Sequence, residues 1–141
     1  MIGLRVGPAF AASDALRITV HGRGGHGSRP EVTIDPIVIG AAIVTGLQSI
    51  VSREVAGTDV AVVTVGSFQS GFKENIIPDT AELMLSVRTF EAGVRDRVLG
   101  AISRVAAGEA AARGAEQGPD VVLVESFPPV VNAVASTDRV R

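Results

Sequence analysis

Hydrophobic and polar residues alternate along short stretches of this chain, a pattern that predicts β-strands with one buried face. In the first stretch Leu16, Ile18 and Val20 share one face, and the residues between them are polar or small. A nearly continuous apolar run predicts the second strand, and alternation returns in the third. The four predicted strands span residues 14–20, 60–65, 81–88 and 121–124. Pro128 ends the last strand, and the tail after it shows no firm pattern.

Two longer stretches show features of helices. Asp35 can cap the free amides of a helix, and Pro36 suits the first helical position, so a helix is predicted to start there. The residues up to about 53 are apolar on more than one face, so we expect this helix to bury one side on its own sheet and another on a partner. Between residues 91 and 113, apolar residues recur at helical spacing with charged residues opposite, which predicts a second helix.

The predicted elements follow the order β-α-β-β-α-β of the ferredoxin-like fold, in the α+β class. Right-handed crossovers place both helices on one face of a four-stranded antiparallel sheet. The second strand, 60–66, then lies at a sheet edge, and an apolar edge promotes aggregation unless something covers it. Association with a second copy of the chain, through this edge strand and through helix 36–53, would cover both the open edge and the second apolar side of the helix. We therefore expect a homodimer, although burial against another domain would also cover the edge.

Composition narrows the classes of partner. The chain has 141 residues, 46% of them hydrophobic, which fits one globular domain with a moderate core. A net charge of −2 gives no electrostatic reason to expect nucleic acid or an anionic membrane. The apolar runs are interrupted, so no membrane span is expected. Cysteine is absent, which excludes disulfide and thiol chemistry and fits a cytoplasmic protein.

Candidate chemistry gathers in residues 21–30, which contain both histidines of the chain, His21 and His26. Gly22–Gly27 matches the dinucleotide-binding pattern formally, but that motif must open a helix directly, and the predicted helix starts only at Asp35. Nucleotide binding is therefore not expected. Nor can a histidine without a second cluster of ligands build a metal site. Any chemistry of His26 must be shared with groups outside this sequence.

Several motifs occur in an order that resembles a known family. They are Gly24–Pro30, Thr33–Ile37, Leu47–Glu54, Gly71 with Asn75–Asp79, and Val87–Thr89. Their series resembles the dimerisation (lid) domain of the zinc-dependent amidohydrolases related to aminoacylase, hippurate hydrolase and glutamate carboxypeptidase. The hippurate hydrolase and N-acyl-amino-acid amidohydrolase branch is the most similar. The resemblance covers roughly Ala12 to Asn132.

The resemblance implies that the domain is inserted in a larger catalytic domain, which holds two zinc or similar divalent ions. Residues 12–127 are then the dimerisation and lid domain, and 1–11 and 128–141 are the connections to the catalytic domain. No metal ligand set is expected in this chain. It is expected to be an excised lid that does not hydrolyse N-acyl amino acids or peptides by itself.

The resemblance also implies roles for individual residues. His26 matches the lid histidine that reaches the active site of the partner subunit and polarises the scissile carbonyl, as an oxyanion-hole donor would. Asn75 and Gly71 match positions of the loop that contacts substrate. Arg88 matches a strand arginine that binds the substrate's carboxylate, for which a guanidinium is well shaped. His21 receives no role.

Two other functions remain open from the sequence. One is a free-standing ferredoxin-like module that binds a small ligand at the glycine-rich loop, as a regulatory domain would. The other is a structural oligomerisation unit in which His26 has no chemical role. Stabilisation of the chain by an amino acid or a nucleotide would favour the first of these.

Overall fold

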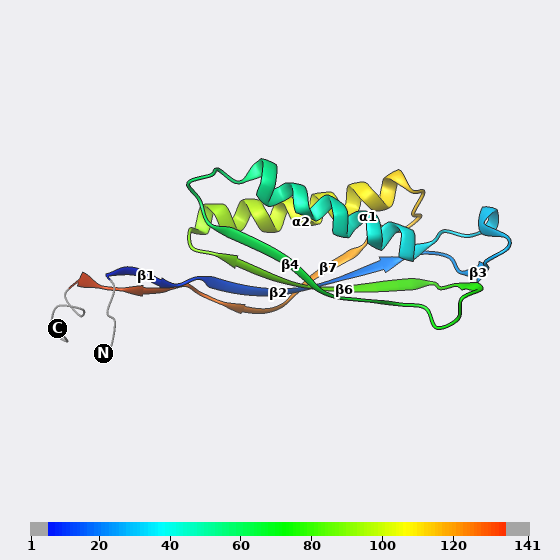
Figure 1. Ribbon diagram of the computed structural model, residues 1–141, viewed down its shortest axis with the longest axis horizontal. Coiled ribbons are helices and arrows are strands. Elements are labelled where there is room, and N and C mark those ends of the chain that lie inside the picture. The colour runs from blue at the N-terminus through cyan, green and yellow to red at the C-terminus, as the bar shows by residue number, and fades with distance from the viewer. Residues whose placement is uncertain (1–5, 135–141) are drawn as a thin grey trace.

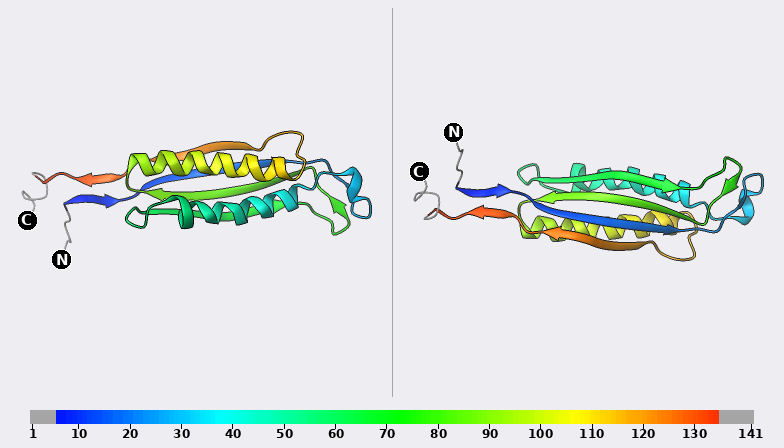
Figure 2. Two further views of the ribbon diagram at one scale, coloured as in Figure 1. Left: turned by 90° about the horizontal axis from the view of Figure 1, so that it is seen from above. Right: turned by 90° about the horizontal axis from the view of Figure 1, so that it is seen from below.

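The computed structural model describes residues 6–134. Residues 1–5 and 135–141, which belong to the two connections expected from the sequence, lie outside the described residues. A layer of two helices covers one face of an elongated sheet (Figure 1), and the two views of Figure 2 show the helices above the sheet and its other face uncovered. The expected α+β class is confirmed.

Four antiparallel strands form the main sheet, in the order β4-β6-β2-β7. The two inner strands are long and directly opposed over their whole length, from Ala12 opposite Thr89 to His21 opposite Thr80. The edge at β4 is the one expected from the sequence, and β7 forms the other edge. The strands are β2 (Ala12–His21), β4 (Ala61–Ser70), β6 (Thr80–Thr89) and β7 (Asp120–Phe127).

Both edge strands are longer than the sequence pattern predicts. In β4 the pairing register shifts between Val65 and Ser67, and in β7 a similar irregularity faces Ala15 and Leu16 of β2. A bulge adds one residue to a strand and so reverses the phase of the alternating pattern. For this reason the predicted strands 60–65 and 121–124 stop at the bulges, whereas the real strands continue beyond them.

The helices are α1 (Pro36–Ser49), which runs on as a π-helical segment (Ile50–Glu54), and α2 (Ala92–Ala112). The predicted cap is confirmed, because the Asp35 side chain accepts hydrogen bonds from the backbone amides of Ile37 and Val38. The helices and the inner sheet face enclose a core of aliphatic residues. Its largest fully buried members include Ile18, Ile39, Ile43, Leu47, Leu83 and Ile102.

One helical stretch, Pro36–Glu54, is long and apolar enough to cross a membrane by length and composition alone. In this structure it packs on the sheet and buries Ile39, Ile43 and Leu47 almost completely. Core helices of globular domains have the same composition when they are buried on more than one side.

A two-stranded ribbon leaves the main sheet at one end (Figure 1). It pairs β1 (Gly7–Phe10) with β8 (Val130–Asn132) in antiparallel register. The expectation of a patternless tail after Pro128 is therefore wrong over these residues. Strands of three or four residues are too short to show an alternating pattern, and the partners are far apart in sequence. We call this ribbon the neck.

A buried ion pair lies close to the neck. Asp14 of β2 is 1% exposed, and its carboxylate accepts two hydrogen bonds from Arg95 of α2, at 2.8 and 2.9 Å. The Ser126 hydroxyl of β7 donates a third, at 2.6 Å. The guanidinium of Arg95 beside Asp14 holds the pKa of that carboxyl below its usual value, against the opposing effect of burial. The cluster joins two strands and a helix where the chain enters the neck.

We predict that Asp14→Asn destabilises the fold by about 3 kcal/mol at neutral pH, because it removes one partner of a buried ion pair. Since the folded-state pKa is the lower one, the ion pair stabilises the fold above the unfolded carboxyl pKa of about 3.9. That stabilisation disappears as the pH falls through the folded-state pKa. The difference in unfolding free energy between the variant and the unaltered chain, measured by denaturant unfolding, should therefore become smaller in acid.

The matched control is Asp96→Asn, since Asp96 also approaches Arg95 but is largely exposed. This substitution should change the free energy of unfolding by about 0.5 kcal/mol or less. A deficit of Asp14→Asn that stays constant from neutral to acidic pH would contradict the assignment.

Candidate functional site

Two loops meet at the end of the sheet opposite the neck. The first follows β2 and contains the short strand β3 (Gly25–His26), and the second precedes β6 and contains β5 (Ile76–Ile77). The two strands pair antiparallel, with His26 opposite Ile76. Next to them, the Gly27 amide donates to the Asn75 carbonyl oxygen at 2.8 Å. The structure thus brings His26 and Asn75, both predicted site residues, into one pair of loops.

The glycines of the His26 loop allow close approach rather than unusual backbone angles. None of them has a positive φ. A Cβ atom on Gly22 would lie 2.3 Å from the Ile34 carbonyl oxygen, and one on Gly24 would lie 2.4 Å from that of Ile77. Such distances are impossible for real side chains, so each glycine lets two backbone segments touch. Gly71 is different, because it ends β4 with a φ of 71°, where glycine is strongly preferred.

Asp79 holds both loops to the end of the sheet. Its carbonyl oxygen accepts from the Gly22 amide at 2.7 Å, and its carboxylate accepts from the Gly24 amide at 2.8 Å. In the sequence Asp79 is one residue of a motif and has no predicted function. Its position one residue after Pro78, in a motif shared with Asn75, was the only available signal.

Two further polar contacts attach the His26 loop to the turn between α2 and β7. The His21 Nε2 atom lies 2.7 Å from an Asp120 carboxylate oxygen, and the Arg23 guanidinium donates to Glu116 at 2.6 Å. His21 therefore has a structural partner, which the sequence could not reveal because Asp120 is 99 residues away. These contacts fix the base of the loop and leave its tip exposed.

The imidazole of His26 is exposed at that tip. Its Nδ1 atom accepts a hydrogen bond from the Ser28 amide at 3.1 Å and lies 2.8 Å from the Ser28 hydroxyl oxygen. Within residues 6–134 no hydrogen-bond partner faces the Nε2 atom. This nitrogen is therefore free to contact a group outside the chain.

Arg88 lies far from His26, near the other end of β6. It faces Ser13 of β2 and Val62 of β4, on the sheet face that the helices leave open. Arg88 is exposed and has no ion-pair partner within residues 6–134. A strand rises about 3.3 Å per residue, so the ten-residue β6 separates Arg88 from the His26 loop by roughly 30 Å. The structure does not bring Arg88 together with His26 and Asn75.

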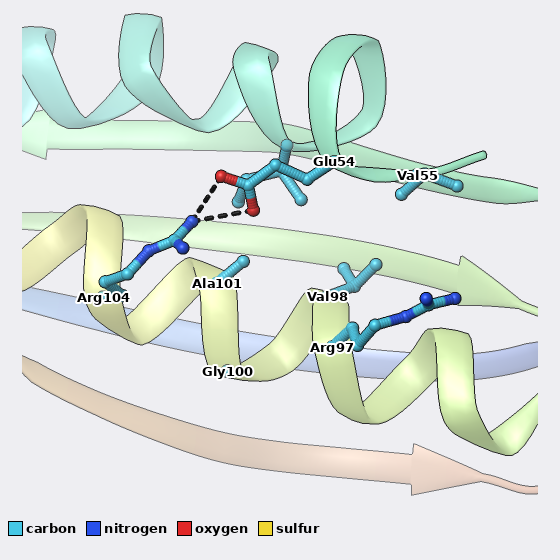
Figure 3. A pocket seen from close by; sticks show the side chains of 8 residues that line it. Glu54, Val55, Arg97, Val98, Gly100, Ala101 and Arg104 are labelled. Carbon is cyan, nitrogen blue, oxygen red and sulfur yellow. Dashed lines mark hydrogen bonds and ion pairs between the residues drawn. The ribbon is translucent and has the colours of Figure 1, made fainter. Parts of the chain in front are cut away.

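A groove of about 320 Å³ lies between the π-helical end of α1 and α2, away from these residues. Figure 3 shows that Arg104 reaches across it to the carboxylate of Glu54. Arg97, also on its rim, lies within 3.4 Å of Asp59. Both arginines are already neutralised by carboxylates, so the groove is not an anion site. Within residues 6–134 no three His, Cys, Asp or Glu side chains are grouped to hold a metal ion.

The comparisons with known proteins identify the family. Residues 12–113 match the family model of the peptidase dimerisation domain, and the chain belongs to that family. It is 43% identical over 115 residues to the N-acetylcysteine deacetylase of Bacillus subtilis, covering 82% of this chain and 30% of that protein. It is 42% identical over 113 residues to the hippurate hydrolase of Campylobacter jejuni, covering 80% of this chain and 30% of that protein.

A solved structure agrees with these matches. The fold superposes on a dinuclear metal-binding peptidase of the M20 family from Bacillus subtilis with a TM-score of 0.72 and 31% identity. That match covers 96% of this chain and 32% of the peptidase. The chain thus spans about a third of the length of the relatives it matches. These matches confirm the resemblance seen in the sequence, and they do not favour a free-standing ligand-binding module.

We predict that Gly24→Ala loosens the junction of the two loops, because its Cβ would collide with the Ile77 carbonyl oxygen. Overpacking of this kind costs about 1–3 kcal/mol. Thermal unfolding should show the loss, and amide hydrogen exchange should accelerate at Gly27, whose amide bonds to Asn75. Gly57→Ala is the control, since a Cβ there meets open space. Equal stability of the two variants would refute this role of Gly24.

Proposed function

We propose that this chain is the dimerisation and substrate-lid domain of a metal-dependent amidohydrolase that cleaves the amide bond of N-acyl amino acids or peptides. The names of the relatives, a deacetylase and a hippurate hydrolase, support this substrate class. The two divalent ions would belong to the catalytic domain, and the match to a dinuclear metal-binding peptidase supports this part of the proposal. The strand order β4-β6-β2-β7, with both helices on one face, supports the ferredoxin-like assignment.

One observation carries the proposal: the His26 loop and the neck lie at opposite ends of the sheet (Figure 1). The neck holds both described ends of the chain, so the catalytic domain would attach there. Ten-residue strands then keep His26 about 30 Å from its own attachment point. His26 would instead contact the catalytic domain of the partner subunit. This separation supports the action of His26 in trans.

Arg88 fits the same geometry from the other end. It is the penultimate residue of β6, close to the neck, and so faces the catalytic domain of its own subunit. One active site would then receive Arg88 from its own lid and His26, with Asn75, from the lid of the partner. In this arrangement Arg88 binds the substrate carboxylate bidentately. His26 donates to the scissile carbonyl, where negative charge develops, and the loop from Gly71 to Asn75 contacts the substrate.

The edge at β4 and the adjoining face of α1 form the proposed homodimer interface. No charged residue occurs in α1, and its exposed positions Ala41, Thr45 and Gln48 lie one turn apart. The side chains of Thr45 and Gln48 donate hydrogen bonds to carbonyl oxygens of their own helix. Burying this stripe would therefore leave few polar groups without partners. A shallow groove between α1 and β4, lined in part by Leu47, Val51 and Val63, continues the same surface.

In the full-length enzyme, His26→Ala should reduce turnover by ~10²–10³-fold, the loss typical of one oxyanion donor. Steady-state kinetics on an N-acetyl amino acid measures it. Mixing this variant with subunits that retain His26 but lack the metal ligands should restore activity in the mixed dimers. Only there does an intact metal site face an intact His26. Absence of any recovery would exclude action in trans.

The two sheet edges allow a matched test of the interface. Val62 of β4 is 48% exposed and Val122 of β7 is 44% exposed, and both face away from the helices. We expect Val62→Lys to shift the chain towards monomer in analytical ultracentrifugation, because a lysine on an edge strand opposes pairing. Val122→Lys should leave the association unchanged. The reverse outcome would move the interface to β7.

A further inference from the structure

We propose that Ser28 is a positioning residue for His26: it fixes the imidazole as the tautomer that carries its proton on Nε2 and turns that N–H out of the loop. The inference rests on the proposed function, since it explains how His26 is prepared to donate to a substrate. It concerns this chain's own residues and can be tested without the catalytic domain.

Two groups of Ser28, its backbone amide and its hydroxyl, together determine the tautomer. An amide N–H can only donate, and it points at Nδ1 of His26 over 3.1 Å. A proton on Nδ1 would face this N–H directly, so the amide favours an unprotonated Nδ1 in the neutral ring. The hydroxyl of Ser28, 2.8 Å from the same atom, can then donate to it as well. In neutral imidazole the remaining proton lies on Nε2.

The surrounding backbone holds the ring in this orientation. The Gly27 amide donates to the Asn75 carbonyl oxygen at 2.8 Å, and the Arg29 amide donates to the His26 carbonyl oxygen at 2.9 Å. His26 itself is paired with Ile76 in the short sheet. Residues 26–29 thus form a closed turn in which the ring lies against Ser28. Of the two ring nitrogens, Nε2 is the one without a hydrogen-bond partner within residues 6–134.

This arrangement restricts what His26 can bind. A neutral imidazole with its proton on Nε2 offers a donor there and no lone pair, so it suits an acceptor such as a carbonyl or carboxylate oxygen. Metal ligation requires an unprotonated ring nitrogen, and the only such nitrogen, Nδ1, is occupied by Ser28. Ser28 therefore selects the amide oxygen of the substrate over a metal ion as the partner of His26.

Proton–nitrogen correlation spectra of the ¹⁵N-labelled histidine side chains test the tautomer in the 141-residue chain. The two histidines are assigned with His26→Gln, and the buffer is kept alkaline enough for neutral rings. We expect His26 to show only the Nε2–H form, more completely than the histidine of an unstructured peptide with the sequence of residues 24–30. Ser28→Ala removes the hydroxyl and keeps the amide, so it should move His26 part of the way towards the peptide's mixture, and Ser28→Thr should not. A peptide-like mixture in the unaltered chain would overturn the proposal.

Kinetics of the full-length enzyme tests the consequence. Ser28→Ala should lower kcat about fivefold, because a factor of this size corresponds to the net contribution of one hydrogen bond. KM should change little. Ser28→Thr should restore kcat, and Ser28→Ala should add nothing in the His26→Ala background. Ser103→Ala, an exposed serine of α2, is the control.

The outcomes separate the two proposals. If His26→Ala itself leaves kcat intact, the proposed function of His26 fails. If His26→Ala impairs turnover but Ser28→Ala changes neither kcat nor the tautomer, only the role of Ser28 is refuted.

Discussion

The uninterrupted pairing of β2 with β6 is the constraint on which the rest of the structure depends. Ten residues of each strand are directly opposed, from Ala12 and Thr89 at one end to His21 and Thr80 at the other. The pairing sets the length of the domain. It also places Arg88 at the end near the neck and His26 at the opposite end. Because the neck continues from one end of β2 and the His26 loop from the other, no local rearrangement of a loop can bring Arg88 to His26. A site that combined Arg88 with His26, as proposed, would therefore require two copies of the domain.

The sequence predicts what depends on local pattern and misses what depends on distant pairing. The alternation around Leu16, the Asp35 cap and the helical spacing after Glu91 are local, and the structure contains all three elements. The neck and the pairing of His26 with Ile76 are made by strands of two to four residues. Such strands are too short for any periodicity, so their existence becomes clear only when the longer strands have brought the partners together.

The same distinction between local pattern and distant pairing applies to the candidate site. The motif identifies His26 as a candidate, whereas the contacts of Ser28 with its Nδ1 atom are visible only in the structure. The glycines of the loop let its backbone approach the backbones near Ile34 and Ile77. Asp79 joins the two loops through one carboxylate and one carbonyl group. That role depends on a meeting of loops about 55 residues apart, which no local pattern encodes.

The composition of α1 connects the fold to the proposed dimer. A helix without charges has no reason to face water on one side, yet Val38 remains more than half exposed in the single chain. The neighbouring helix α2 instead carries exposed charged residues such as Arg97 and Arg104, as a solvated helix does. The two layers of the domain are thus asymmetric: the β7 edge lies beside the charged helix and the β4 edge beside the uncharged one. Hydrophobic burial would therefore favour association at β4 over β7, because only there do an open strand and an apolar helix face form one continuous surface.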